Sequence, residues 1–169
     1  MAQVRHLAAG PTELDQAWGV RPQFYSIFMG DYQASIGRAD PVLVELCRLR
    51  MAHLLDSDFD RSLRYQPAVT AGLTEAKIAD IGNYGTSALF TECERQCLAF
   101  AELFVIQSSS IGDEDVARVQ ELLGSEQFIY FVKALSVIDQ LQRSVVAFDV
   151  RPGPAVPPTM SDFRVLQAA

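Results

Sequence analysis

The sequence predicts an all-α protein with about seven helices. Apolar residues recur at helical spacing, helix start and stop signals alternate along the chain, and no run alternates between apolar and polar residues for long enough to predict a strand. The 169 residues, 49% of them hydrophobic, are enough for one domain with a real core. We expect a helical domain at residues 22–151, after a lead-in at 1–21 and before a proline-rich tail at 152–169.

The first helices are predicted from proline and glycine signals. A short helix is expected at residues 11–18, within the lead-in. The next helix begins at Pro22, because proline suits the first helical position, and ends near Gly37. Its apolar side chains at helical spacing are expected to pack in the core; they are Phe24, Ile27, Phe28 and Tyr32.

A nearly wholly apolar helix follows. Asp40 and Pro41 are its predicted cap and first residue, and its apolar side chains point in almost every direction as far as Leu55. A helix with this pattern is buried, so its polar members need partners. Glu45 and Arg48 lie three residues apart and can pair on one face.

In the segment after this central helix, a proline falls inside a predicted helix. A second helix would span residues 58–71, but Pro67 inside it would cost about 3 kcal/mol. Either the helix kinks, or residues 57–66 take another path. Ser57 and Asp60 match a capping pattern at its start.

Four more helices complete the prediction, and each has its own start signal. Thr74 caps the first, Thr91 with Glu94 forms a capping box for the second, three acidic residues open the third, and Ser125 caps the last. Their expected bounds are about 75–82, 92–107, 113–124 and 125–150.

Composition argues against several classes of partner. The net charge is -7 and the Lys and Arg residues are scattered, whereas nucleic-acid binding needs a concentrated basic face. No apolar run approaches the roughly 20 residues that a membrane span requires. The N-terminal residues contain too short an apolar region for a secretory signal, so a cytoplasmic location is expected.

The few histidines and cysteines predict neither a metal site nor a disulfide. Two histidines are too few for a zinc site built mainly from histidine. Three cysteines, an odd number without a regular spacing, do not indicate a disulfide scaffold. Cys93 and Cys97 are four residues apart, which places their Cβ atoms about 5–6 Å apart on a helix, too far for a disulfide. We expect both, and Cys47, to be small core residues.

The order of motifs in residues 22–151 resembles the carboxymuconolactone decarboxylase and alkylhydroperoxidase D-like superfamily. The matching pieces are RPQFYSIFMGDYQASIGRADP, PVLVELCRLRMA, AGLTEAKIADIGNYGTSALF, TECERQCLAFAELF and SVIDQLQRSVVAFDV. The resemblance implies an all-helical fold that assembles as trimers or hexamers, and a pocket for a small molecule lined by the central helix pair.

In the peroxidase branch of that superfamily the second helix begins with Cys-x-x-Cys, and a His follows four residues later. A proton-relaying Glu lies twelve residues before the first Cys. The matching positions here hold Ser57, Asp60 and Arg64, while Glu45 is retained. A serine hydroxyl cannot form a sulfenic acid or a disulfide, so peroxide reduction by this route is excluded. The decarboxylase branch also uses a His at the Arg64 position, and that His is missing too.

Three functions remain open. The first is non-redox acid–base chemistry on a small anionic molecule, as in a decarboxylase, lyase or hydrolase, without a cofactor. Its candidate catalytic residues are Glu45, Asp58 and Asp60, and its candidate substrate-binding residues are Arg64, His53 and Ser57. The second is a helical oligomer that has lost catalysis and serves as a binding or scaffold protein. The third is a peroxidase that uses Cys47, Cys93 or Cys97.

Each candidate residue also has a purely structural interpretation. Ser57 and Asp60 suit a helix start, and Arg64 lies four residues after Asp60, at ion-pair spacing. Glu45 is expensive to bury without a partner, and either Arg48 or Arg50 can supply one.

Overall fold

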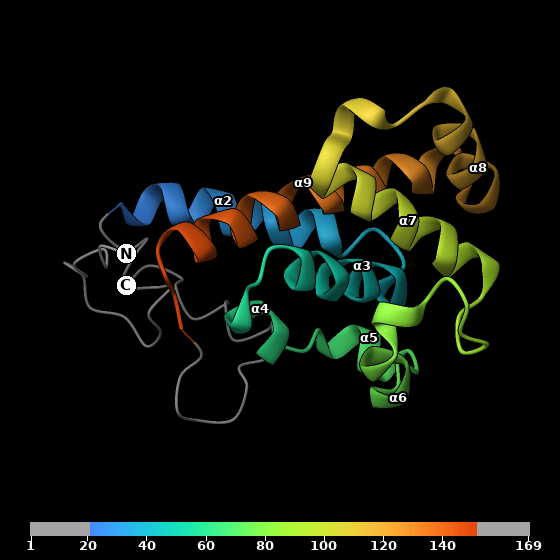
Figure 1. Ribbon diagram of the computed structural model, residues 1–169. Coiled ribbons are helices and arrows are strands. Elements are labelled where there is room, and N and C mark those ends of the chain that lie inside the picture. The colour runs from blue at the N-terminus through green and yellow to red at the C-terminus, as the bar shows by residue number, and fades with distance from the viewer. Residues whose placement is uncertain (1–20, 152–169) are drawn as a thin grey trace.

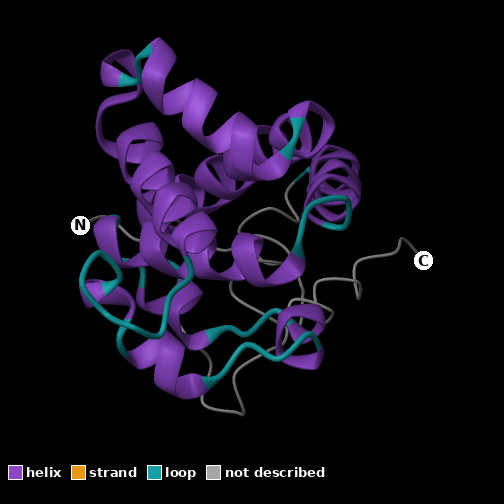
Figure 2. Cartoon of the chain, turned by 90° about the vertical axis from the view of Figure 1, so that its right-hand side faces the viewer, coloured by secondary structure: helices purple, strands orange, loops and turns teal. Residues whose placement is uncertain are grey.

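The computed structural model describes residues 21–151, and this part of the chain is all-helical, as predicted (Figures 1 and 2). The long helices are α2 (Pro22–Ile36), α3 (Pro41–Leu54), α7 (Glu92–Gln107), α8 (Asp113–Leu123) and α9 (Ser125–Ala147). The short ones are α4 (Asp58–Ser62), α5 (Gln66–Thr70) and α6 (Glu75–Ala79), with two 3₁₀ turns, η1 (Ile81–Asn83) and η2 (Ser108–Ser110). The helix predicted at residues 11–18, the lead-in and the tail lie outside the described residues.

Helix α3 forms the centre of the bundle. It packs against α7 and α9 and against the short helices α4 and α5, while α2 lies along α9 and α8 packs on α7 and α9 (Figure 1). Most of α3 is buried, including the side chains of Glu45 and Arg48. The prediction of a buried central helix is therefore confirmed.

The helix-start signals correspond to observed caps, with one exception. Asp40 Oδ1 accepts from the Leu43 N–H at 2.9 Å, and Thr91 and Glu94 form the reciprocal capping box. The prediction that Ser125 caps α9 is wrong, because Ser125 is the first residue of that helix. Gly124, with φ +79, makes the tight passage from α8 into α9.

The last helix also ends earlier than expected. Helix α9 stops at Ala147 rather than near Val150, and Asp149 adopts a left-handed φ of 53. The Val150 N–H then donates to the Val145 carbonyl at 3.0 Å, which closes the helix end.

The aromatic stripe on α2 is only partly in the core. Tyr32 is 2% exposed, but Phe24 and Ile27 are 69% and 73% exposed. Helix α2 buries its other face, formed by Tyr25, Met29, Tyr32 and Ile36, at spacings of four, three and four residues. Phe24 and Ile27 therefore lie on the solvent face, and the core prediction is wrong for both.

No helix among residues 21–151 has the length and apolar character needed to cross a membrane.

Candidate functional site

Pro67 breaks the second helix of the predicted pair. Helix α4 ends at Ser62, the following Leu63 has extended backbone angles, and Pro67 lies in the first turn of the separate helix α5. Proline is tolerated there because the first helical N–H groups have no intrahelical acceptor. The alternative path for residues 57–66 is the one observed, and the extended Leu63–Tyr65 linker is hydrogen-bonded to side chains of α3.

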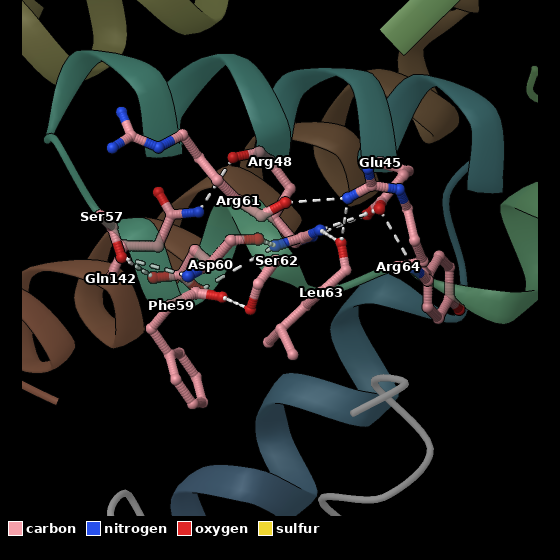
Figure 3. A network of polar contacts seen from close by, with 11 residues as sticks. Glu45, Arg48, Ser57, Phe59, Asp60, Arg61, Ser62, Leu63, Arg64 and Gln142 are labelled. Carbon is pink, nitrogen blue, oxygen red and sulfur yellow. Dashed lines mark hydrogen bonds and ion pairs between the residues drawn. The ribbon is translucent and has the colours of Figure 1, made fainter. Parts of the chain in front are cut away.

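A buried ion pair on α3 meets this linker. Arg48 Nε donates to Glu45 Oε2 at 2.6 Å, and Arg48 Nη2 donates to Glu45 Oε1 at 2.8 Å (Figure 3). Glu45 is 0% exposed and Arg48 is 1% exposed. Two parallel hydrogen bonds are the strong form of an arginine–carboxylate pair. The pairing of Glu45 with Arg48, expected from their spacing of three residues, is therefore observed.

The same two side chains satisfy the backbone of the linker. Arg48 donates to the Asp60 carbonyl at 2.8 Å and to the Leu63 carbonyl at 2.9 Å, and Glu45 Oε1 accepts from the Tyr65 N–H at 3.0 Å. Buried peptide groups without partners cost free energy. Because the linker is not helical, Glu45 and Arg48 supply partners that a helix ladder would otherwise provide.

Asp60 and Ser57 complete the buried network. The Asp60 N–H donates to Ser57 Oγ at 3.3 Å, the cap expected from the sequence, and Ser57 Oγ lies 2.5 Å from Asp60 Oδ2. Arg48 Nη1 is 4.0 Å from Asp60 Oδ1. Burial raises the pKa of Asp60, and Glu45 adds to this, while Arg48 and Ser57 oppose it.

Gln142 on α9 is a member of the network that the sequence did not indicate. Its Nε2 donates to the Arg48 carbonyl at 2.9 Å, and its Oε1 is buried with no partner within the described chain. Its burial could have been predicted from its position, four residues after Ile138 on the apolar face of α9. A glutamine in that stripe is buried, but its partner cannot be read from spacing alone.

The other three predicted site residues do not join the network. Asp58 is exposed and pairs with Arg61, which lowers the pKa of the Asp58 carboxyl. His53 is exposed, and its pKa is lowered by partial desolvation and by the nearby Arg61 and Arg50.

Arg64 faces a different partner from the one expected. Its Nε donates to Glu75 at 3.0 Å and its Nη1 to the carbonyls of Arg61 and Leu63 at 2.8 Å. The predicted ion pair between Arg64 and Asp60 is thus replaced by one between Arg64 and Glu75 on α6, because the helix ends at Ser62.

A cleft of about 350 Å³ lies on the outer side of the network. Ser57 and Asp58 form one wall, and the end of α9 with Asp149 and Arg151 forms the other. The cleft thus reaches Ser57, whereas Glu45 has no exposed surface.

The three thiols are elsewhere and are poorly suited to nucleophilic chemistry. Cys47 and Cys97 are buried, Cys93 is half-buried, and all three are free, so Cys93 and Cys97 do not bridge. Burial raises the pKa of each thiol. Cys93 lines a second cleft of about 260 Å³ beside Asp40 and Phe131, away from the Glu45 network. Residues 21–151 contain no group of three or more His, Cys, Asp or Glu side chains placed to hold a metal ion.

Comparison with known proteins does not name a family. A scan against models of protein families finds no match for this chain, and a search of curated proteins finds none either. The site is therefore defined by its own geometry, as a closed ion-pair network between a central helix and an extended linker.

Proposed function

We propose that this protein is a non-catalytic helical binding protein that assembles with further copies of itself. In this proposal the network of Glu45, Arg48 and Asp60 holds the fold together. The observation that carries it is the state of Glu45, whose two oxygens accept three N–H bonds while none of its surface is exposed.

A general acid or base must come within hydrogen-bond reach of the proton it transfers, about 2.6–3.2 Å between heavy atoms. Glu45 is 0% exposed and Asp60 is 2% exposed, so a substrate would have to displace the α4–α5 segment to meet either. Displacing it would break the hydrogen bonds that Arg48 donates to the Asp60 and Leu63 carbonyls and the one that Glu45 accepts from the Tyr65 N–H. The closed network thus favours a structural role for both carboxyl groups.

The exposed side chains of Phe24 and Ile27 support assembly. They lie three residues apart on one face of α2 and are among the most exposed large apolar residues of the described chain. Large apolar side chains grouped on a surface mark contact sites. We assign them to contact between copies of this chain, in the trimer or hexamer that the resemblance implies.

Sedimentation velocity tests this assembly. The wild-type chain is expected to sediment as more than one copy at micromolar concentration, and the Phe24→Glu, Ile27→Glu double variant as a monomer with unchanged helicity. A matched control carries the same two added charges at exposed polar positions, Gln33→Glu and Gln140→Glu, and should keep the wild-type mass. A monomeric wild-type chain, or dissociation of the control as well, would overturn the assignment.

A second candidate function is favoured by the cleft at Ser57 and Asp58. It is the non-redox acid–base chemistry expected from the sequence, with Asp58 rather than Glu45 in contact with a small anionic substrate. A screen of lactones and small carboxylic acids tests it. Turnover that disappears in a folded Asp58→Asn variant would support this candidate over the binding protein, and absence of turnover would support the binding protein.

A further inference from the structure

The buried network contains more negative than positive charge. Glu45, Arg48 and Asp60 are at most 2% exposed, and they comprise two carboxyl groups and one guanidinium group. If both carboxyl groups were ionised, one negative charge would be buried without compensation, which is very costly. Two carboxyl groups that share a site avoid this when one of them keeps a proton.

The hydrogen bonds around Glu45 leave no place for that proton. Its oxygens are surrounded by three donors, Arg48 Nε, Arg48 Nη2 and the Tyr65 N–H, at 2.6, 2.8 and 3.0 Å. A proton on either oxygen would point at a donor and find no acceptor. Protonated Glu45 would also leave Arg48 as an unpaired buried cation.

Asp60 has room for a proton. Its Oδ2 lies 2.5 Å from Ser57 Oγ, a hydroxyl that can accept as well as donate, and its Oδ1 is 4.0 Å from Arg48 Nη1, beyond hydrogen-bond reach. The Asp60 carboxylic acid would donate to Ser57 Oγ. The hydroxyl proton of Ser57 would then be free to turn toward the cleft that Ser57 lines.

We propose that Asp60 carries a proton in the folded protein at neutral pH, and that its ionisation releases the α4–α5 segment from α3. Asp60 would then act as a latch that a rise in pH opens. The titratable groups that surround it are Glu45 and Arg48 on α3 and Tyr32 on α2. Burial also raises the pKa of Tyr32, so this hydroxyl adds no charge.

The direction of the effect follows from linkage. A carboxyl whose pKa is higher in the folded than in the unfolded chain binds its proton more tightly when folded. Its contribution to stability is therefore full below the unfolded value of 3.8 and is lost as the pH rises through the folded value. Ionised Asp60 would gain by moving into water, and α4, with five residues and one buried apolar side chain, is the element best able to follow it.

Carbon-13 NMR of the Asp60 carboxyl tests the protonation directly in the wild-type chain. At neutral pH its chemical shift is expected to be that of a carboxylic acid, while the shift of the exposed Asp58 carboxyl is that of a carboxylate. A carboxylate shift for Asp60 at neutral pH would overturn the proposal, and this experiment needs no variant to fold.

Hydrogen exchange and the Asp60→Asn variant test the latch. After correction for intrinsic exchange, amides of residues 58–65 should lose protection by at least about tenfold between about pH 6 and pH 9 in the wild type, as expected for a local opening. Asp60→Asn keeps a neutral donor to Ser57 Oγ and should abolish this loss, while Asp58→Asn, a matched change on the same helix, should retain it. The same pH-dependent loss in Asp60→Asn, or none in the wild type, would contradict the latch.

Discussion

Replacement of Arg48 by Met is the sharpest test of the network. Arg48→Met keeps an unbranched side chain of similar length and removes five N–H donors at a position that is 1% exposed. Glu45 loses its counter-ion, and the carbonyls of Asp60 and Leu63 each lose one of two donors, keeping the Leu63 N–H and Arg64 Nη1 respectively. The main loss is therefore the cation that compensates the buried Glu45 carboxylate.

The expected cost is large compared with the stability of a domain. Breaking one side of a buried ion pair costs about 3–5 kcal/mol, and each lost hydrogen bond to a carbonyl that keeps another donor adds about 0.5–1.5 kcal/mol. We therefore expect a loss of about 5 kcal/mol at neutral pH, close to the whole stability of a marginal domain.

Urea unfolding followed by circular dichroism measures this loss, and a second variant keeps the test decisive if Arg48→Met does not fold. In Glu45→Met, Arg48→Met both charges are gone, so the double variant should be more stable than Arg48→Met by at least about 2 kcal/mol. Arg61→Met serves as the control, since its pairs with Asp56 and Asp58 lie at the surface, and should cost at most about 1 kcal/mol. An Arg48→Met chain within about 1 kcal/mol of wild type would refute the reasoning.

Three smaller changes test single features of the site. Pro67→Ala should lower the free energy of unfolding by about 0.4–1 kcal/mol, because Pro67 lies in the first turn of α5 and restricts the unfolded chain; a gain of about 3 kcal/mol would instead indicate a continuous helix. Gln142→Met should change stability by no more than about 1 kcal/mol, since the lost bond to Arg48 is offset by removal of the unpartnered Oε1; a loss above about 2 kcal/mol in thermal unfolding would contradict this. With a maleimide at neutral pH, mass spectrometry should find Cys93 labelled at least about tenfold faster than Cys97, and equal rates would show that burial does not control these thiols.

The sequence predicted the central helix well because its signals are local. Asp40 and Pro41 define its start within four residues, and Glu45 and Arg48 meet through a spacing of three residues on one helix. Pro67 likewise predicted a break in the helix expected at residues 58–71, because proline lacks the backbone N–H that a helix interior requires. Each of these inferences needs only neighbours along the chain.

Features that depend on a partner element were missed. Phe24 and Tyr32 both belong to an apolar stripe on α2, but only packing against α9 decides which of them is buried. The partner of Gln142 could not be predicted for the same reason, since the Arg48 carbonyl that it contacts is 94 residues away along the chain. The sequence could have separated Asp58 from Asp60, because two residues correspond to about 200° around a helix and only one of the two can face α3.

Glu45 is a weaker candidate for catalysis than the resemblance alone suggests. A carboxyl at this position has three structural roles, which are to pair with Arg48, to accept from the Tyr65 N–H and to balance the buried guanidinium charge. Its removal would destabilise the fold whether or not the protein is an enzyme, so loss of activity on changing Glu45 cannot by itself assign a catalytic role. Asp58 is the more informative position, because it lines the cleft and its only ion pair, with Arg61, lies at the surface of the described chain. Substitution of Asp58 can abolish turnover without unfolding the protein. It therefore distinguishes a catalytic from a structural role, which substitution of Glu45 cannot do.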